Sequence, residues 1–203
     1  MSEATSAEAT PRSWLLAVRE RLADPPPRRL PPGEQRRASV LVPLFVQSGE
    51  LWTILTKRTD TLPTHRSQIA FPGGGLDLGE DPWAAALREA EEEVGIAAEK
   101  VLRLGQLDEV ETPVGFRVVP CVGAVPYPYE ARPNEAEIAE VFSLPLTAFA
   151  NPRLIEDRTV TIDAVPRSLR IYHVGNRQIW GLTARVLQNL LVRLGVEGAP
   201  DAE

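Results

Sequence analysis

The chain has 203 residues and a formal net charge of −6, with 43% hydrophobic and 25% charged residues. This size and composition are typical of one globular domain with its own core. The acidic balance argues against general nucleic-acid binding, which normally shows a basic footprint. The longest apolar run, 40–46, contains Pro43 and is too short to span a membrane, so we expect neither a nucleic acid nor a membrane as partner.

The first 33 residues predict a tail, a short helix and a connector. Residues 1–9 are small and polar and lack the basic start of a secretory signal, so we expect a cytoplasmic protein. Residues 24–33 contain five prolines, which predict an extended connector. We expect 34–196 to form the main domain and 197–203 a tail. A helix starting near Pro11 would pack one apolar side on the core, made of Trp14, Leu15, Val18 and Leu22.

Strand-like runs dominate the middle of the chain, and helical patterns separate them. This mixture predicts an α/β fold, a sheet covered by helices on both sides. Cys121 lies in an apolar run and is expected to be a buried structural thiol. The tryptophans Trp52, Trp83 and Trp180 are also expected in the core. The expected strands are 39–46, 51–56, 102–110, 116–125, 138–144 and 168–174, and the expected helices after the connector are 82–94, 146–150 and 181–194.

The helix expected at 82–94 has clear boundary signals. Asp81 is a suitable N-cap, Pro82 suits the first helical position, and Gly95 stands just past the end. At about 100° per residue, Glu89 and Glu93 lie within roughly 40° of each other, with Glu92 about 60° to the other side.

These glutamates are badly placed for stability. Each like-charge pair at this spacing costs about 0.2–0.5 kcal/mol, and the end of a helix favours cations over anions. A solvated acidic face is the alternative interpretation. A divalent cation would remove the penalty, and clustered carboxylates without His or Cys suit a hard ion such as Mg²⁺ or Mn²⁺.

Gly74, Glu80 and the run REAEEEVGI at 88–96, separated by five and seven residues, resemble a complete Nudix box. The resemblance implies an α/β/α sandwich around a mixed sheet and the metal-dependent hydrolysis of a diphosphate linked to another moiety. It implies metal binding by Glu92, Glu93 and the region of Gly74, with Glu89 as a third ligand or as an orienter of water.

The same resemblance makes Glu89, Glu92, Glu93 and Arg88 the catalytic candidates. Arg88 is expected to hold a carboxylate in place, and Glu80 to be structural. The general base stays open, between a glutamate of the box and a later carboxylate. The later candidates are Glu135, Glu137 and Glu140.

The segment before the box, ILTKRTDTLPTHRSQIAFPGG at 54–74, resembles the extra motif of the coenzyme A pyrophosphatase branch of the family. Segments 112–123 and 179–185 support the same branch, and the resemblance covers about 39–191. Thr59, Pro63 and Ser67 depart from the branch pattern, Pro63 replacing an expected arginine. The residues expected to bind substrate are Arg58, Arg66, Gln68, Gly73 and Gly74.

Three hypotheses follow. The first is hydrolysis of coenzyme A or its derivatives to 3′,5′-ADP and 4′-phosphopantetheine or its acyl form. The second is a Nudix hydrolase of another nucleoside diphosphate derivative, such as ADP-ribose, motivated by the departures from the pattern. The third is a non-catalytic Nudix-like regulator that binds a nucleotide. The oligomeric state, the acyl form and the preferred metal stay open.

Overall fold

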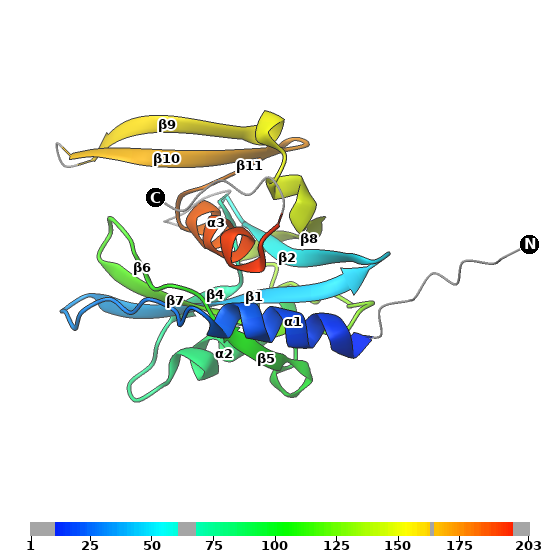
Figure 1. Ribbon diagram of the computed structural model, residues 1–203. Coiled ribbons are helices and arrows are strands. Elements are labelled where there is room, and N and C mark those ends of the chain that lie inside the picture. Colours follow the sequence, from blue (N-terminus) through cyan, green and yellow to red (C-terminus); the bar gives the residue numbers. More distant parts are fainter. Residues whose placement is uncertain (1–10, 61–67, 163–164, 197–203) are drawn as a thin grey trace, which may run out of the picture.

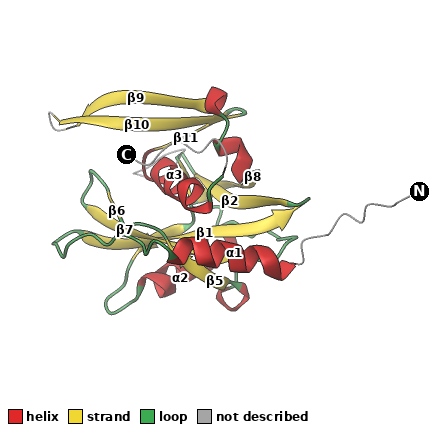
Figure 2. Cartoon of the chain, in the orientation of Figure 1, coloured by secondary structure: helices red, strands yellow, loops and turns green. Residues whose placement is uncertain are grey.

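The computed structural model describes residues 11–60, 68–162 and 165–196. Within these residues, no helix combines the length and apolar character needed to cross a membrane. The chain folds around a mixed sheet, with helices on both sides of it and a separate small sheet above (Figures 1 and 2). The expected α/β architecture is therefore observed.

Eight strands of the described residues form the main sheet, in the order β3-β2-β1-β7-β5. Three further strands pair beside this path: β4 with β1, β6 with β7, and β8 with β2. The β1–β7 pair is parallel and the other pairs are antiparallel. The strands are β1 (Arg36–Gln47), β2 (Glu50–Arg58), β3 (Ile69–Ala70), β4 (Gly73–Gly75), β5 (Leu102–Gln106), β6 (Val110–Glu111), β7 (Phe116–Ala124) and β8 (Ile138–Pro145).

The sequence of β1 is a continuous apolar run because both faces of this strand are covered. Val42 and Leu44 point into a core shared with α1 (Pro11–Ala23) and α3 (Gly181–Leu194). Leu41 and Phe45 point to the opposite face, into a core shared with α2 (Pro82–Val94). A strand covered on both faces loses the polar alternation of a half-exposed one.

The N-terminal helix and the connector dock onto this domain. Val18 and Leu22 of α1 are buried in the core, as the periodicity predicts. The connector has no regular structure, and its backbone bonds to side chains of the loop between β5 and β6: Arg28 N–H donates to Asp108 at 2.9 Å and Leu30 N–H to Glu109 at 2.7 Å. The division at residue 33 stays a prediction.

A second sheet of three strands, in the order β11-β10-β9, was only partly predicted. Strand β10 (Val165–Val174) was expected from 168, whereas β9 (Ile155–Ile162) and β11 (Arg177–Trp180) were not. Strand β9 is largely exposed. Three consecutive charged residues, Glu156 to Arg158, follow its first residue, so it lacks apolar alternation. The β9–β10 hairpin projects beyond the rest of the molecule (Figure 1).

Other differences have local causes. The strand expected at 102–110 is interrupted between β5 and β6, where buried Glu109 pairs with Arg117 at 2.5 Å. The helix expected at 146–150 is a single 3₁₀ turn, η2 (Leu146–Phe149). Trp180 is 45% exposed, so its core assignment is wrong, whereas Cys121 is buried as expected.

Candidate functional site

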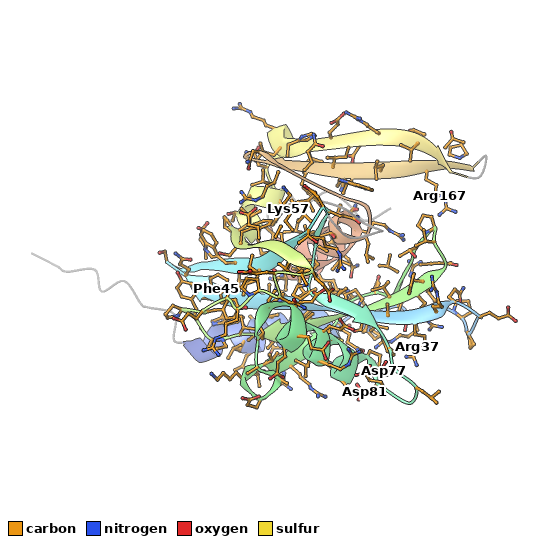
Figure 3. The ribbon with its side chains drawn as sticks, turned by 180° about the vertical axis from the view of Figure 1, so that it is seen from behind. Arg37, Phe45, Lys57, Asp77, Asp81 and Arg167 are labelled. Atoms are coloured by element: carbon orange, nitrogen blue, oxygen red, sulfur yellow. The ribbon has the colours of Figure 1, made fainter. Side chains whose placement is uncertain are left out.

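Helix α2 has the boundaries that its sequence predicts. The Asp81 side chain accepts hydrogen bonds from the backbone N–H groups of Trp83 (2.8 Å) and Ala84 (3.2 Å), which caps the first turn. Gly95 ends the helix in a left-handed conformation, with φ 74°. Figure 3 shows Asp77 and Asp81 in the segment that leads into this helix. The apolar side of α2 packs on the sheet, and this fixes the direction of its glutamates.

Glu93 is the most enclosed of these glutamates, only 4% exposed. Its Oε2 accepts a hydrogen bond from the backbone N–H of Gly73 at 3.1 Å, and its Oε1 accepts one from Arg58 at 3.1 Å. Burial raises the pKa of Glu93 to about 7, although both bonds favour the charged form. The carboxylate is thus held in place while its charge remains costly, which suits a group that binds a cation.

Glu89 lies against the glycines of β4. Its carboxylate accepts a hydrogen bond from Arg88 at 2.8 Å. A Cβ at position 74 would lie 2.4 Å from the carboxyl carbon of Glu89, and one at position 73 would lie 2.3 Å from the carbonyl oxygen of Ser39. Only glycine at both positions lets the strand, the helix and the carboxylate approach this closely.

Arg88 links the helix to the loop before it. Its Nε donates to Oε1 of Glu80 at 3.0 Å, and one terminal nitrogen donates to the Gly75 carbonyl at 3.1 Å. The pKa of Glu80 is lowered, mainly by this arginine and also by the N–H of Asp77. These contacts match the expected structural part of Glu80 and the expected hold of Arg88 on a carboxylate.

Glu92 stands apart from the other two glutamates. Its side chain is 60% exposed and lies 3.6 Å from Arg88. Within the described residues, no three His, Cys, Asp or Glu side chains are arranged to hold a metal ion. The carboxylates of Glu89 and Glu93 bond to Arg88, Arg58 and Gly73 instead of converging with Glu92 on one point.

The donor set nevertheless fits a hard divalent cation. Glu89, Glu92 and Glu93 offer carboxylate oxygens, the ligand type that Mg²⁺ and Mn²⁺ prefer. The Gly74 position is kept open to the Glu89 carboxylate, and burial penalises the Glu93 charge, which a cation would offset. Their metal-binding role stays a prediction.

A later carboxylate joins this group through Arg58. Glu137 lies 3.4 Å from Arg58, and its segment is tied to the helix because the backbone N–H of Asn134 donates to the Glu93 carbonyl at 2.9 Å. Glu140 instead pairs with Arg177, and Glu135 is exposed. Of these three candidates for the general base, Glu137 is the one that contacts Arg58, which also bonds to Glu93.

The expected substrate-binding residues are partly brought together. Arg58 and Gly73 both bond to Glu93, and Gly74 lies against Glu89. The backbone N–H of Arg58 donates to the Gln68 carbonyl at 3.0 Å. Arg66 lies outside the described residues. The contact of Arg58 with Glu93 was not predicted, because no helical or strand period relates residues 35 positions apart.

The chain is similar to proteins of one known family. The model of the NUDIX domain matches residues 35–164. The chain is 38% identical over 173 residues to an uncharacterized Nudix hydrolase, NudL, of Pectobacterium atrosepticum, covering 83% of this chain and 88% of that relative. It is 40% identical over 166 residues to the NudL of Cronobacter sakazakii, covering 79% and 84%.

A solved structure is similar in fold. The MutT/nudix family protein from Enterococcus faecalis matches with a TM-score of 0.53 and 18% identity, covering 84% of this chain and 68% of that one. At this identity the likeness concerns the fold alone.

Proposed function

This chain belongs to the Nudix hydrolase family, and we propose that it hydrolyses the diphosphate of coenzyme A or one of its derivatives with a divalent cation. The products would be 3′,5′-ADP and 4′-phosphopantetheine, or its acyl form. The observation that carries the proposal is Glu93, buried at the end of a complete Nudix box between the Gly73 N–H and Arg58.

The choice of substrate rests on the segment before the box. Leu55, Thr56, Arg58 and the run FPGG at 71–74 match the motif of the coenzyme A branch. Arg58 connects this motif to the candidate catalytic carboxylates, because it bonds to Glu93 and lies 3.4 Å from Glu137. A residue of the segment that resembles the branch motif therefore contacts a glutamate of the Nudix box.

The hydrolysis needs a neutralised diphosphate and an activated water. A bound Mg²⁺ or Mn²⁺, held by Glu89, Glu92 and Glu93 beside Gly74, would neutralise phosphoryl oxygens and lower the pKa of water. Water would add to one phosphorus as the bond from that phosphorus to the bridging oxygen breaks, so that each product keeps one of the two phosphates of the diphosphate. The product 3′,5′-ADP also keeps the 3′-phosphate of the substrate.

The protein's own groups would fix this arrangement. Arg88 holds Glu89 against β4, and the Gly73 N–H holds Glu93. Arg58 supplies a fixed positive charge beside the buried carboxylate, which an acidic protein needs to accept an anionic substrate. The proton leaving the water would be taken by a carboxylate, with Glu89 and Glu137 as the two candidates nearest these residues.

A second candidate is the hydrolysis of another nucleoside diphosphate derivative, such as ADP-ribose. The departures at Thr59, Pro63 and Ser67 favour it, since Pro63 replaces an arginine of the branch motif. Pro63 and Ser67 lie outside the described residues.

A substrate panel with product identification by mass tests the proposal. Coenzyme A, an acyl-coenzyme A, ADP-ribose and a nucleotide sugar are each incubated with Mg²⁺, with Mn²⁺ and with a chelator. We expect release of 3′,5′-ADP from coenzyme A only with a divalent ion. Turnover of ADP-ribose with intact coenzyme A would favour the second candidate. Tight binding of nucleotide without turnover in any metal would favour a regulator.

A further inference from the structure

Three arginines gather at the side of α3 that faces β6, outside the cluster of glutamates. Arg185 of α3 donates a hydrogen bond to the Glu111 carbonyl of β6 at 2.8 Å. The backbone of Arg28 is tied to the same side, because its N–H bonds to Asp108, whose own N–H bonds to Asn189 of α3 at 3.2 Å. Asn189 is one helical turn beyond Arg185, so Arg28 and Arg185 are neighbours.

The third arginine, Arg167, comes from the far end of the β9–β10 hairpin. Figure 3 shows its side chain directed from the hairpin toward the body of the domain. The pKa of Arg185 is lowered, first by desolvation and then by the positive charges of Arg167 and Arg28, although the residue is exposed. Arg167 and Arg28 are therefore each close enough to repel the guanidinium group of Arg185.

Glu111 is the described carboxylate whose charge acts on Arg185, and its effect on that pKa is smaller than the effects of Arg167 and Arg28. None of the three arginines forms an ion pair with a described carboxylate, whereas Arg29, Arg117 and Arg193 nearby each do. The carboxylates of the neighbourhood are already engaged: Asp108 with Arg193, Glu109 with Arg117, and Glu111 with Gln35. Like charges held together without a counter-charge destabilise a fold, and an anionic ligand would remove that cost.

The cluster is linked to the candidate active site by a short series of contacts. Arg58, which bonds to Glu93, donates its backbone N–H to the Gln68 carbonyl. The next residue, Ile69, accepts a hydrogen bond at 2.9 Å from Thr183, two positions before Arg185. These contacts place the first turns of α3, which carry Arg185, beside the segment that leads to Arg58 and Glu93.

We infer that Arg185, Arg167 and Arg28 form a subsite for a phosphate monoester, and that the substrate's 3′-phosphate occupies it. This inference rests on the proposed function. Coenzyme A carries such a group on the ribose next to its diphosphate, whereas dephospho-coenzyme A and ADP-ribose do not. Guanidinium groups suit this ligand because their planar N–H donors match phosphate oxygens. The subsite would select among diphosphates whose hydrolysis is chemically alike.

This inference gives the β9–β10 hairpin a role in binding substrate. Strand β9 and the outer part of β10 are largely exposed and add little to the core. The hairpin carries Arg167 to a place that neither α3 nor the connector supplies. The subsite then draws one arginine from each of three segments: the connector, the second sheet and the last helix.

The test compares two substrates that differ only in the 3′-phosphate. Arg185→Gln and Arg167→Gln are assayed on coenzyme A and on dephospho-coenzyme A. For each variant we expect KM for coenzyme A to rise about tenfold, the loss of a charged hydrogen bond, with kcat and the kinetics of dephospho-coenzyme A unchanged. Arg185→Lys should keep part of the preference because the charge remains.

Arg153→Gln is the matched control. It removes an arginine from the exposed 3₁₀ turn η3 (Pro152–Leu154), and both substrates should behave as with the unmodified protein. A loss shared equally by the two substrates, or no loss, would overturn the subsite. The first result would mean that Arg185 only fastens β6 to α3, and a lowered Tm of Arg185→Gln would accompany it.

A binding measurement separates this inference from the proposed function. Calorimetry compares adenosine 3′,5′-bisphosphate, adenosine 5′-monophosphate and inorganic phosphate with the unmodified protein and with Arg167→Gln. We expect the bisphosphate to bind more tightly than the other two, and Arg167→Gln to remove that advantage. If neither coenzyme A substrate is hydrolysed, the proposed function fails while this result still decides the subsite. Equal binding of all three ligands would overturn it.

Discussion

The glutamates of α2 and the arginine cluster beside α3 differ in whether their charged side chains have partners within the chain. At the first, Glu89, Glu93 and Glu80 each accept hydrogen bonds from an arginine or a backbone N–H within the chain. At the second, Arg28, Arg167 and Arg185 have no carboxylate partner among the described residues, and Arg185 donates to a backbone carbonyl. The first region fixes its charges before any ligand binds, whereas the second leaves them for a ligand.

This difference suggests a division of work. Fixed carboxylates position the groups for a reaction that all diphosphate substrates share. Free guanidinium groups can distinguish substrates by an anionic group far from the bond that breaks. Changes in the first region should therefore alter the rate for every substrate, and changes in the second should alter the preference between substrates.

The largest effect is expected for Glu93→Gln. It keeps the shape of a buried side chain and removes its charge. We expect kcat to fall by about 10²–10³, as for the loss of other groups that stabilise transition-state charge. Steady-state kinetics on coenzyme A and dephospho-coenzyme A should show the same factor for both. A factor that differs between the two would break the proposed division.

Gly74→Ala should be the next in size. Its Cβ would lie 2.4 Å from the carboxyl carbon of Glu89, so that carboxylate must move. We expect kcat/KM to fall by at least about tenfold, because small displacements of positioned groups are costly in rate.

Gly75→Ala is a matched control for that change. The nearest atom to its Cβ would be the Arg37 carbonyl oxygen at 4.0 Å, so the side chain has room. Near-normal activity of Gly75→Ala beside impaired Gly74→Ala is the expected pattern. Equal activity of the two variants would show that the Glu89 position does not matter.

A smaller effect concerns stability and pH. Burial raises the pKa of Glu93 to about 7, from the ordinary value of 4.5, so folding favours its protonated form. The stability that this group contributes is full below pH 4.5 and is lost as pH rises through 7. In the presence of a chelator, Glu93→Gln should therefore be more stable than the unmodified protein above pH 7, by about 1–3 kcal/mol.

Thermal unfolding at several pH values measures this effect. The difference in Tm between Glu93→Gln and the unmodified protein should grow between pH 5 and 7 and level off above, following the shifted pKa. A pH-independent difference would contradict the assignment of a raised pKa to Glu93. A divalent cation should shrink the difference, since it binds the charged form.

The two long helices of the domain could be predicted to the residue. Asp81, Pro82 and Gly95 mark the ends of α2, and an apolar stripe marks α3, so local chemistry decides both. Strands β1 and β2 were predicted with ends one to three residues off, because their β-ladders extend beyond the apolar run. The short strands β3 and β4 were missed, since glycines and a two-residue pairing carry no alternation.

The site was predictable in its residue types and not in its contacts. The Nudix box indicated Glu89, Glu92 and Glu93, yet the contact of Glu93 with Arg58 and the 60% exposure of Glu92 depend on how the helix packs in the folded chain. The arginine cluster had no signal at all, because its members are 18 to 157 positions apart in the sequence and meet only through folding.

The most direct test of the account measures kcat/KM for coenzyme A and dephospho-coenzyme A with Mg²⁺, for the unmodified protein, Glu93→Gln and Arg185→Gln. We expect Glu93→Gln to lower both values by the same factor, whereas Arg185→Gln lowers only the value for coenzyme A. An equal effect of Arg185→Gln on the two substrates, or no divalent-dependent hydrolysis of either, would contradict it.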